Sequence, residues 1–347
     1  MGEGESKPIR KLAAFELYLK GLYSSRLDTR EGLEEALRCF ESAMREDPGL
    51  AMAYSACAET FVRGAGVLFP PSEAFRRAKE LVALADELEP GSSEVHKVLG
   101  DLALRGTLDW ETAESEFRQA LALNPGDAEA HFRYSVLLAT LQRFGEAQEE
   151  LREALRANPM LTSAWQWLIE LRYRSGDLSA ATALAEEVRD RDPNSFETRW
   201  WTGCCYWAAG RTAEASKESE ELAGPAKPRN RVSRAILLGL LGKPEEAARL
   251  VRELERESTS RYVPLGWIAD LHAILGEKEK AVDALERDLR EGDRGLWLGY
   301  QLPQYDPFRS EPRFVALLRE YHLPTEPSAR SVSSGVSEPK DLEPATT

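Results

Sequence analysis

Apolar residues recur along most of this chain at the three- and four-residue spacings of helices, in blocks that end at a proline. The closing prolines are Pro48, Pro90, Pro125, Pro159 and Pro193, and they lie 42, 35, 34 and 34 residues apart. Proline cannot continue a helix, and it restricts the residue before it. Five such blocks in order, converging on one period, predict a repeated helical unit.

Small residues stand at fixed distances before these prolines. Twelve residues before them are Ala36, Ala78, Ala113, Ala147 and Ala181, and five residues before them are Ala43, Ala85, Ala120, Ala154 and Val188. These offsets lie on one stripe of a helix. A methyl group there lets two helices approach closely, whereas a larger side chain would overpack the contact. Each unit is therefore predicted to be a helix, a short turn, a second helix and a proline.

Weaker copies of the unit follow. Ala215, and the pairs Ala235 with Ala247 and Ala269 with Ala281, keep the alanine pattern without a well-placed closing proline. Residues 11–290 then divide into eight units of 35 residues. We expect a flexible N-terminus over 1–10, a superhelix over 11–290, a cap over 291–324 with a helix near Glu311–Tyr321, and a disordered tail over 325–347.

The pattern resembles the tetratricopeptide repeat, a 34-residue helical hairpin. The residues on its signature positions are Trp165, Leu99, Gly100, Ala113, Phe117, Ala120 and Pro125. The resemblance implies an all-α, right-handed α-solenoid of about eight hairpins with a C-terminal capping helix. It also implies a non-catalytic scaffold or adaptor that binds a protein or peptide in its concave groove.

A second resemblance is to the tetratricopeptide region of bacterial signalling proteins, namely serine/threonine kinases, adenylate cyclases and winged-helix regulators. It rests on the segments AFELYLKGLYSSR, LFPPSEAFRRAKELVALADELEP and RGLWLGYQLPQYDPFRSEPRF. Only ten residues precede Lys11, so we expect no output domain here. The alternative to an adaptor is a ligand-sensing regulatory module of such a signalling system.

Composition narrows the classes of partner. Among 347 residues, 45 are Lys or Arg and 59 are Asp or Glu, which gives a net charge of −14. This balance argues against general nucleic-acid binding and against docking on anionic membranes. No apolar run is long enough to span a membrane, and the N-terminus does not read as a secretory signal. Four cysteines do not make a disulfide framework, so we expect a reducing, cytoplasmic location.

Motifs for catalysis are absent from the sequence, including phosphate-binding loops, zinc-protease motifs and nucleophile elbows. His96 and His131 hold equivalent repeat positions, and packing is favoured over a paired metal ligand because zinc needs three or four ligands. Cys204 and Cys205 are adjacent on a predicted helix, where buried thiols are favoured over a redox pair. We therefore expect no enzyme activity, metal or cofactor.

The first helix of each unit should line a concave face. Its inward positions give the candidate partner-binding residues Phe132, Gln166, Glu170, Tyr173, Arg174, Trp200 and Trp207. Trp, Tyr and Arg are enriched at binding hot spots, although Trp200 and Trp207 have packing between helices as an alternative. The chaperone-carboxylate clamp is not expected, since Asp101 stands where that clamp has asparagine. The sequence leaves the oligomeric state open.

Overall fold

Helical hairpins follow one another along the chain in the computed structural model, which describes residues 3–27, 29–66, 68–193, 195–222, 228–258, 263–291 and 299–326. The first four hairpins are α1 (Glu3–Ser25) with α2 (Arg30–Glu46), α3 (Ala51–Gly64) with α4 (Pro71–Leu88), α5 (Ser93–Asp101) with α6 (Trp110–Leu123), and α7 (Ala128–Thr140) with α8 (Phe144–Ala157). The next four are α9 (Thr162–Arg174) with α10 (Leu178–Arg191), α11 (Phe196–Ala208) with α12 (Thr212–Glu221), α13 (Pro228–Leu240) with α14 (Pro244–Ser258), and α15 (Leu265–Ile274) with α16 (Lys278–Glu291). The all-α solenoid of about eight units is confirmed.

Alanines form the contacts between helices, as expected. Every alanine of the predicted stripe is fully buried, from Ala36 in α2 to Ala281 in α16. The second helix of most early units ends just before the closing proline, and a capping side chain stands two residues after that proline. Ser92, Asp127 and Ser195 each accept a hydrogen bond from the first backbone N–H groups of the next helix. Proline and cap together set the start of each new hairpin.

One unit is a residue too long, and the backbone absorbs the extra residue locally. Pro90 and Pro125 lie 35 residues apart, and residues Leu102–Thr107, which come directly after α5, form a π-helix (η1). A π-turn inserts one residue into a helix and leaves the register of the next helix unchanged. The π-helix also separates two hydrophobic clusters, one within residues 36–98 and one within residues 103–323.

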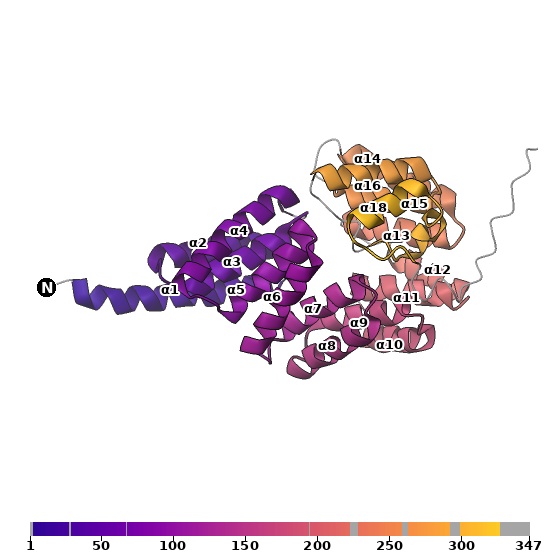
Figure 1. Cartoon of the computed structure of the whole chain (residues 1–347). Coiled ribbons are helices and arrows are strands. Elements are labelled where there is room, and N and C mark those ends of the chain that lie inside the picture. Colours follow the sequence, from indigo (N-terminus) through magenta and orange to yellow (C-terminus); the bar gives the residue numbers. More distant parts are fainter. Residues whose placement is uncertain are drawn as a thin grey trace, which may run out of the picture.

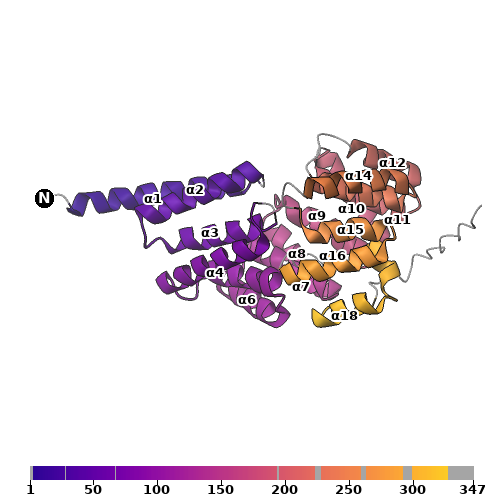
Figure 2. The ribbon, with the colours of Figure 1, turned by 90° about the horizontal axis from the view of Figure 1, so that it is seen from above.

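The C-terminal segment caps the solenoid and also reaches back to its middle. It contains the 3₁₀-helix η2 (Pro303–Phe308) and the helix α18 (Pro312–Glu320), which buries Phe314, Leu317 and Leu318. Arg313 holds α18 on α16 through three carboxylates at 2.7–3.0 Å. Figures 1 and 2 show α13–α18 lying beside α7–α11. The expected capping helix is confirmed, and we call residues 299–326 the clasp.

Of the N-terminal segment 1–10 that was expected to be flexible, only residues 1 and 2 lie outside the described residues. Helix α1 begins at Glu3, eight residues before the expected start of the superhelix. Of the expected C-terminal tail, only Thr325 and Glu326 are described, and both belong to the clasp.

Candidate functional site

A strip of charged side chains crosses the first helices of the second, third and fourth hairpins. We define the inner strip as Glu59 of α3, Lys97 and Asp101 of α5, Arg133 of α7, and Asp127, which caps α7. The Lys97 ammonium lies 3.5 Å from a carboxylate oxygen of Glu59 and 3.5 Å from one of Asp127. The strip therefore ties three successive hairpins together.

Burial and opposite charge compete for these groups. Burial on its own would lower the pKa of Lys97, but the charges of Glu59 and Asp127 outweigh it and raise that pKa. Burial would raise the pKa of Glu59, yet the nearby cations, with Lys97 first among them, hold it below its usual value. The opposite charges around each group therefore favour its ionised form.

Asp101 is the least compensated member of the strip. It is 2% exposed, and its Oδ1 atom has no hydrogen-bond partner among the described residues. The nearest contact with Arg133 joins Nε to Oδ2 at 3.7 Å, beyond hydrogen-bond range. Burial raises the pKa of Asp101 despite the charges of Arg133 and Arg105. Burial also lowers the pKa of Arg105 to about 10.

Phe132 extends the strip with an aromatic surface. It is half-buried on α7, and the Arg133 guanidinium lies 5.4 Å from the centre of its ring. Arg133 is also fixed by Glu129, one turn earlier, at 2.7 Å. An aromatic ring beside a fixed arginine is the composition of a binding hot spot.

Three other residues expected in the groove keep partial exposure. Gln166 donates a hydrogen bond of 3.0 Å to the hydroxyl of Ser195, which caps α11. Glu170 forms an ion pair with Arg174 on α9. Trp207 is half-buried against the larger hydrophobic cluster. These side chains follow Phe132 around the solenoid, although Gln166 and Glu170 are already held by other groups.

Tyr173, Arg174 and Trp200 were expected in the groove, with packing between helices as the alternative for Trp200, and the structure buries all three. Their exposures are 0%, 1% and 9%. Tyr173 and Trp200 both lie against Trp201, with ring centres 5.6 and 6.0 Å apart. The Arg174 guanidinium lies 5.4 Å from the ring of Trp167. These three side chains are parts of the core and offer no surface to a partner in this structure.

The clasp binds the end of α7 and lies near Arg174 of α9. The Tyr300 hydroxyl donates to the carbonyl of Thr140 at 2.6 Å, and the Gln301 amide donates to the carbonyls of Ala139 and Thr140 at 3.1 Å. Burial raises the pKa of Tyr300, and the nearby Arg174 charge opposes this rise. The clasp therefore fixes the C-terminal segment to the last turn of α7.

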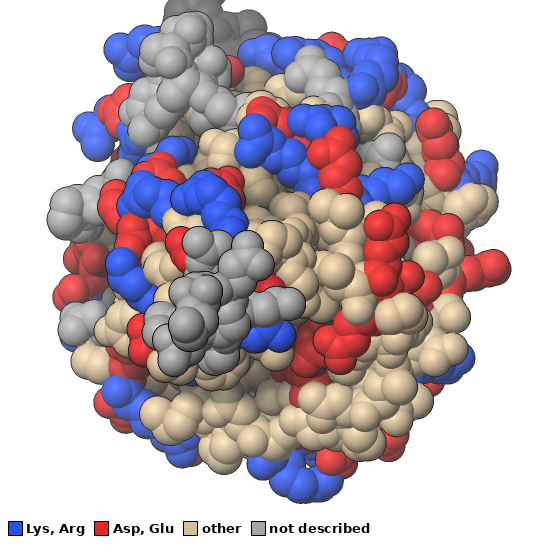
Figure 3. Space-filling view, turned by 90° about the vertical axis from the view of Figure 1, so that its left-hand side faces the viewer, with Lys and Arg blue, Asp and Glu red and all other residues tan. Residues whose placement is uncertain are grey.

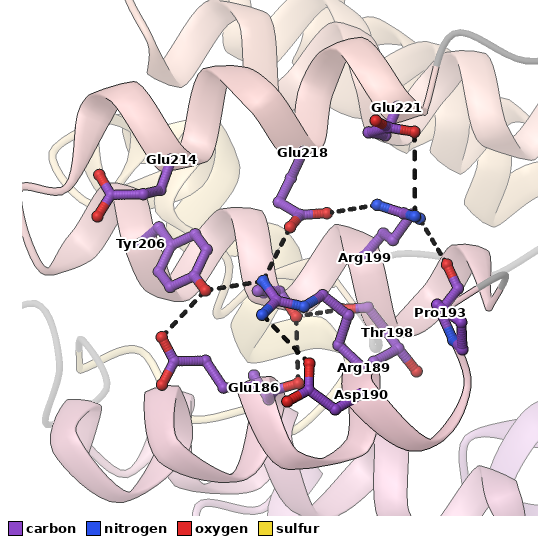
Figure 4. A network of polar contacts seen from close by, with 12 residues as sticks. Glu186, Arg189, Asp190, Pro193, Thr198, Arg199, Tyr206, Glu214, Glu218 and Glu221 are labelled. Atoms are coloured by element: carbon purple, nitrogen blue, oxygen red, sulfur yellow. Dashed lines mark hydrogen bonds and ion pairs between the residues drawn. The ribbon is translucent and has the colours of Figure 1, made fainter.

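A second polar network lies between α10, α11 and α12 (Figure 4). The buried Glu218 carboxylate accepts hydrogen bonds from Arg189 and Arg199, each at 3.0 Å. Arg189 also donates to the Tyr206 hydroxyl at 2.8 Å, which in turn donates to Glu186 at 3.0 Å. Each of these five side chains forms a hydrogen bond with a side chain of another helix. The network fixes the contact between two hairpins and leaves little for a ligand.

Two histidines make polar contacts between helices, and the cysteines are buried. His96 and His131 each contact a glutamate of the following helix, Glu116 at 2.7 Å and Glu150 at 2.6 Å. All four cysteines are buried and unpaired with one another. Within the described ranges, no group of three or more His, Cys, Asp or Glu side chains is placed to hold a metal ion. A depression of about 540 Å³ on α6, lined by residues such as Glu114 and Arg118, is open to solvent.

Comparison with protein families identifies the hairpins. Two tetratricopeptide-repeat models match this chain, one over residues 109–169 and the other over residues 168–230. The hairpins within residues 109–230 are tetratricopeptide repeats. Such repeats generally mediate contacts between proteins. The crystal structure of a tetratricopeptide repeat protein from Parabacteroides merdae overlays with a TM-score of 0.52 at 15% identity, over 80% of this chain and all of that one. It supports the fold alone.

Two relatives match a part of this chain. The transcriptional regulator HilA of Salmonella typhimurium is 25% identical over 193 residues, which are 54% of this chain and 34% of HilA. Superkiller protein 3 of Schizosaccharomyces pombe is 24% identical over 204 residues, or 56% of this chain and 14% of that protein. The chain therefore spans between about a seventh and a third of the length of these relatives. No helix in the described segments is both long and apolar enough for a membrane crossing.

The inner strip was missed at the level of sequence, although a signal for it exists. Lys97 and Asp101 lie four residues apart at inward positions, and they served only to exclude a known clamp. Applying the same inward register to α3 also gives Glu59. Charged residues at inward positions of two consecutive hairpins, Glu59 in the second and Lys97 and Asp101 in the third, were the clue.

Proposed function

We propose that this protein is a non-catalytic interaction scaffold whose inner strip, together with Phe132, binds a segment of a protein partner. The observation that carries the proposal is the Phe132–Arg133 pair beside charged groups from three hairpins. The strip is held in place before any partner arrives, so little side-chain entropy is lost on binding. Its mixed charges favour a polar segment with one apolar side chain for Phe132.

The test uses a library of random peptides displayed against the full-length chain. Phe132→Ala is expected to weaken selected peptides at least about tenfold, because it removes the apolar anchor. Phe144→Ala is the matched control, since Phe144 is also half-buried but begins α8. Circular dichroism checks that both variants stay folded. Peptides that bind all three proteins equally would overturn the proposal.

The similarity to HilA favours a second candidate function, a regulatory module of a signalling system. In that case the repeats sense a small molecule rather than a peptide. A thermal-shift screen of metabolites distinguishes the two. A shift that persists in the Phe132→Ala variant, without any peptide selected by the library, would support the regulatory module over the scaffold.

A further inference from the structure

Helix α1 presents a row of large apolar side chains to solvent. Leu12, Phe15, Leu19 and Tyr23 are 60%, 41%, 48% and 68% exposed, and Leu27 continues the row just beyond the helix at 52%. Their spacings of three and four residues place them along one side of the helix. The other side of α1 is already used, because Gly21 packs closely against the Phe40 ring of α2. We call these five residues the α1 stripe.

The position of the α1 stripe makes it unusual. Helix α1 forms the N-terminal end of the solenoid (Figure 1). End repeats of solenoids normally turn a polar face outward, because no further repeat stacks on them. The C-terminal end follows this rule through α18, whereas the α1 stripe does not. A contiguous exposed apolar patch of this kind marks an interaction surface.

We propose that a second copy of this chain covers the stripe, with the two α1 helices packed antiparallel about a two-fold axis. The charges beside the stripe favour a second copy as its occupant. Glu16 and Lys20 are both exposed and lie one turn apart on the same edge of the stripe. A two-fold axis perpendicular to the helices places the same edge of both helices on the same side of the interface. The two copies of that edge then run in opposite directions. Each Glu16 then faces Lys20 of the other copy, in two equivalent ion pairs.

The existing contacts of Lys20 are compatible with this pairing. Lys20 lies 2.6 Å from Glu35, and Glu35 also holds Arg38 at 2.8 Å. Glu35 therefore keeps a cationic partner when Lys20 turns toward a second copy. The side of the molecule that lies on the left in Figure 1 carries both acidic and basic side chains among uncharged surface (Figure 3). Such a surface suits a neighbour with the same mixture of charges.

Two other occupants fit less well. Residues 327–347 contain only Val332, Val336 and Leu342 as large apolar residues and no aromatic residue, so they cannot match five large side chains. An anionic membrane is disfavoured by Glu16 beside the stripe and by the net charge of −14. The measurements of self-association and of vesicle binding distinguish both of these occupants from a second copy.

Sedimentation equilibrium of the full-length chain tests the dimer. One helix per copy is a small interface, so we expect a dissociation constant of about 1 to 100 µM. The mass should rise from 38.8 kDa toward twice that value as the concentration increases. Leu19→Glu should remain monomeric, whereas Leu123→Glu, at a 54% exposed leucine of α6, should dimerise normally. A wild-type chain that stays monomeric at several hundred micromolar would overturn the proposal.

Charge reversal tests the antiparallel register. Glu16→Lys and Lys20→Glu should each weaken self-association about tenfold, because each places like charges opposite one another. A mixture of the two variants should form heterodimers of wild-type affinity, since both contacts are then attractive. Circular dichroism confirms the fold of each variant. A mixture that does not restore association would contradict the register and with it the proposal.

The remaining occupants give distinct results. Dimers that form only after residues 327–347 are deleted would assign the stripe to that segment. Binding of a monomeric chain to phosphatidylglycerol vesicles that is lost in Leu19→Glu would assign it to a membrane. Either outcome overturns the second-copy proposal.

Discussion

The indole Nε1 of Trp110 donates a hydrogen bond of 2.7 Å to the backbone carbonyl of Tyr321, which lies 211 residues further along the chain. Trp110 begins α6, and Tyr321 comes directly after α18 within the clasp. In an open solenoid, contacts join only neighbouring repeats. Here the clasp contacts the third hairpin through Trp110. It also contacts the fourth hairpin, where Tyr300 and Gln301 bond to α7.

Trp110→Phe tests the strength of this closure. The substitution keeps an aromatic ring but leaves the carbonyl of Tyr321 without its donor, so the free energy of unfolding should fall by about 1–2 kcal/mol. Trp165→Phe is the control, because its indole bonds to the carbonyl of Pro159 only six residues away at an exposed site. Urea denaturation should show little change for Trp165→Phe. Equal losses for the two variants would mean that the clasp adds no stability through Trp110.

Gly100→Ala tests the close contact inside the third hairpin. A Cβ atom at Gly100 would lie 2.8 Å from the Phe117 ring, which is fully buried and has no room to move. We expect a loss of about 1–3 kcal/mol in the free energy of unfolding. Gly145→Ala, in the first turn of α8 with open space around it, should instead gain about 0.5–1 kcal/mol. A stable Gly100→Ala variant would refute the packing described for this hairpin.

Asp270 should make stability depend on pH. Burial raises its pKa to about 6, although hydrogen bonds from Tyr305 and Gln304 oppose the rise. A raised carboxyl pKa stabilises the folded state below pH 4, and this contribution is lost as the pH rises toward 6. Asp270→Asn, measured by urea denaturation, should therefore gain stability relative to wild type between pH 4 and pH 7, by about 3 kcal/mol at most. A constant difference across this range would contradict the raised pKa.

The cysteine thiols should be unreactive in the folded protein. Burial raises the pKa of Cys57 and of Cys205 to about 12, and Cys39 and Cys204 are also buried. Thiolates are the reactive form, so a disulfide reagent at pH 7.5 should label none of the four until the chain is unfolded in urea. Rapid labelling of Cys204 and Cys205 in the native protein would contradict this expectation and support the alternative that they form a redox pair.

The repeats were predictable because their signals are local. Ala113, Phe117 and Ala120 lie within eight residues of one another, and a helix brings such residues onto one face without knowledge of the rest of the chain. The 35-residue spacing between Pro90 and Pro125 also had a local cause in the π-helix. Patterns of this kind depend only on helix geometry.

The burial of Tyr173 and Arg174 was not predictable in the same way. The register placed both residues in the groove. In the structure Tyr173 packs on Trp201 of α11, and Arg174 lies near Tyr300, which comes more than 120 residues later. The sequence around Tyr300 and Gln301 contains no pattern that predicts hydrogen bonds to the carbonyls of Ala139 and Thr140. Contacts between distant parts of the chain depend on the accumulated curvature of all intervening hairpins, which a repeat pattern does not contain.

The clasp also limits how this chain can evolve. An open array gains or loses a hairpin at little cost, because each unit meets only its neighbours. Here an insertion between α7 and α15 would turn the last unit away, and Tyr321 would no longer meet Trp110. The hydrogen bond between Trp110 and Tyr321 therefore requires a fixed number of hairpins between them. Homologous proteins that keep this contact should differ in loops and sequence but have the same number of units in this stretch.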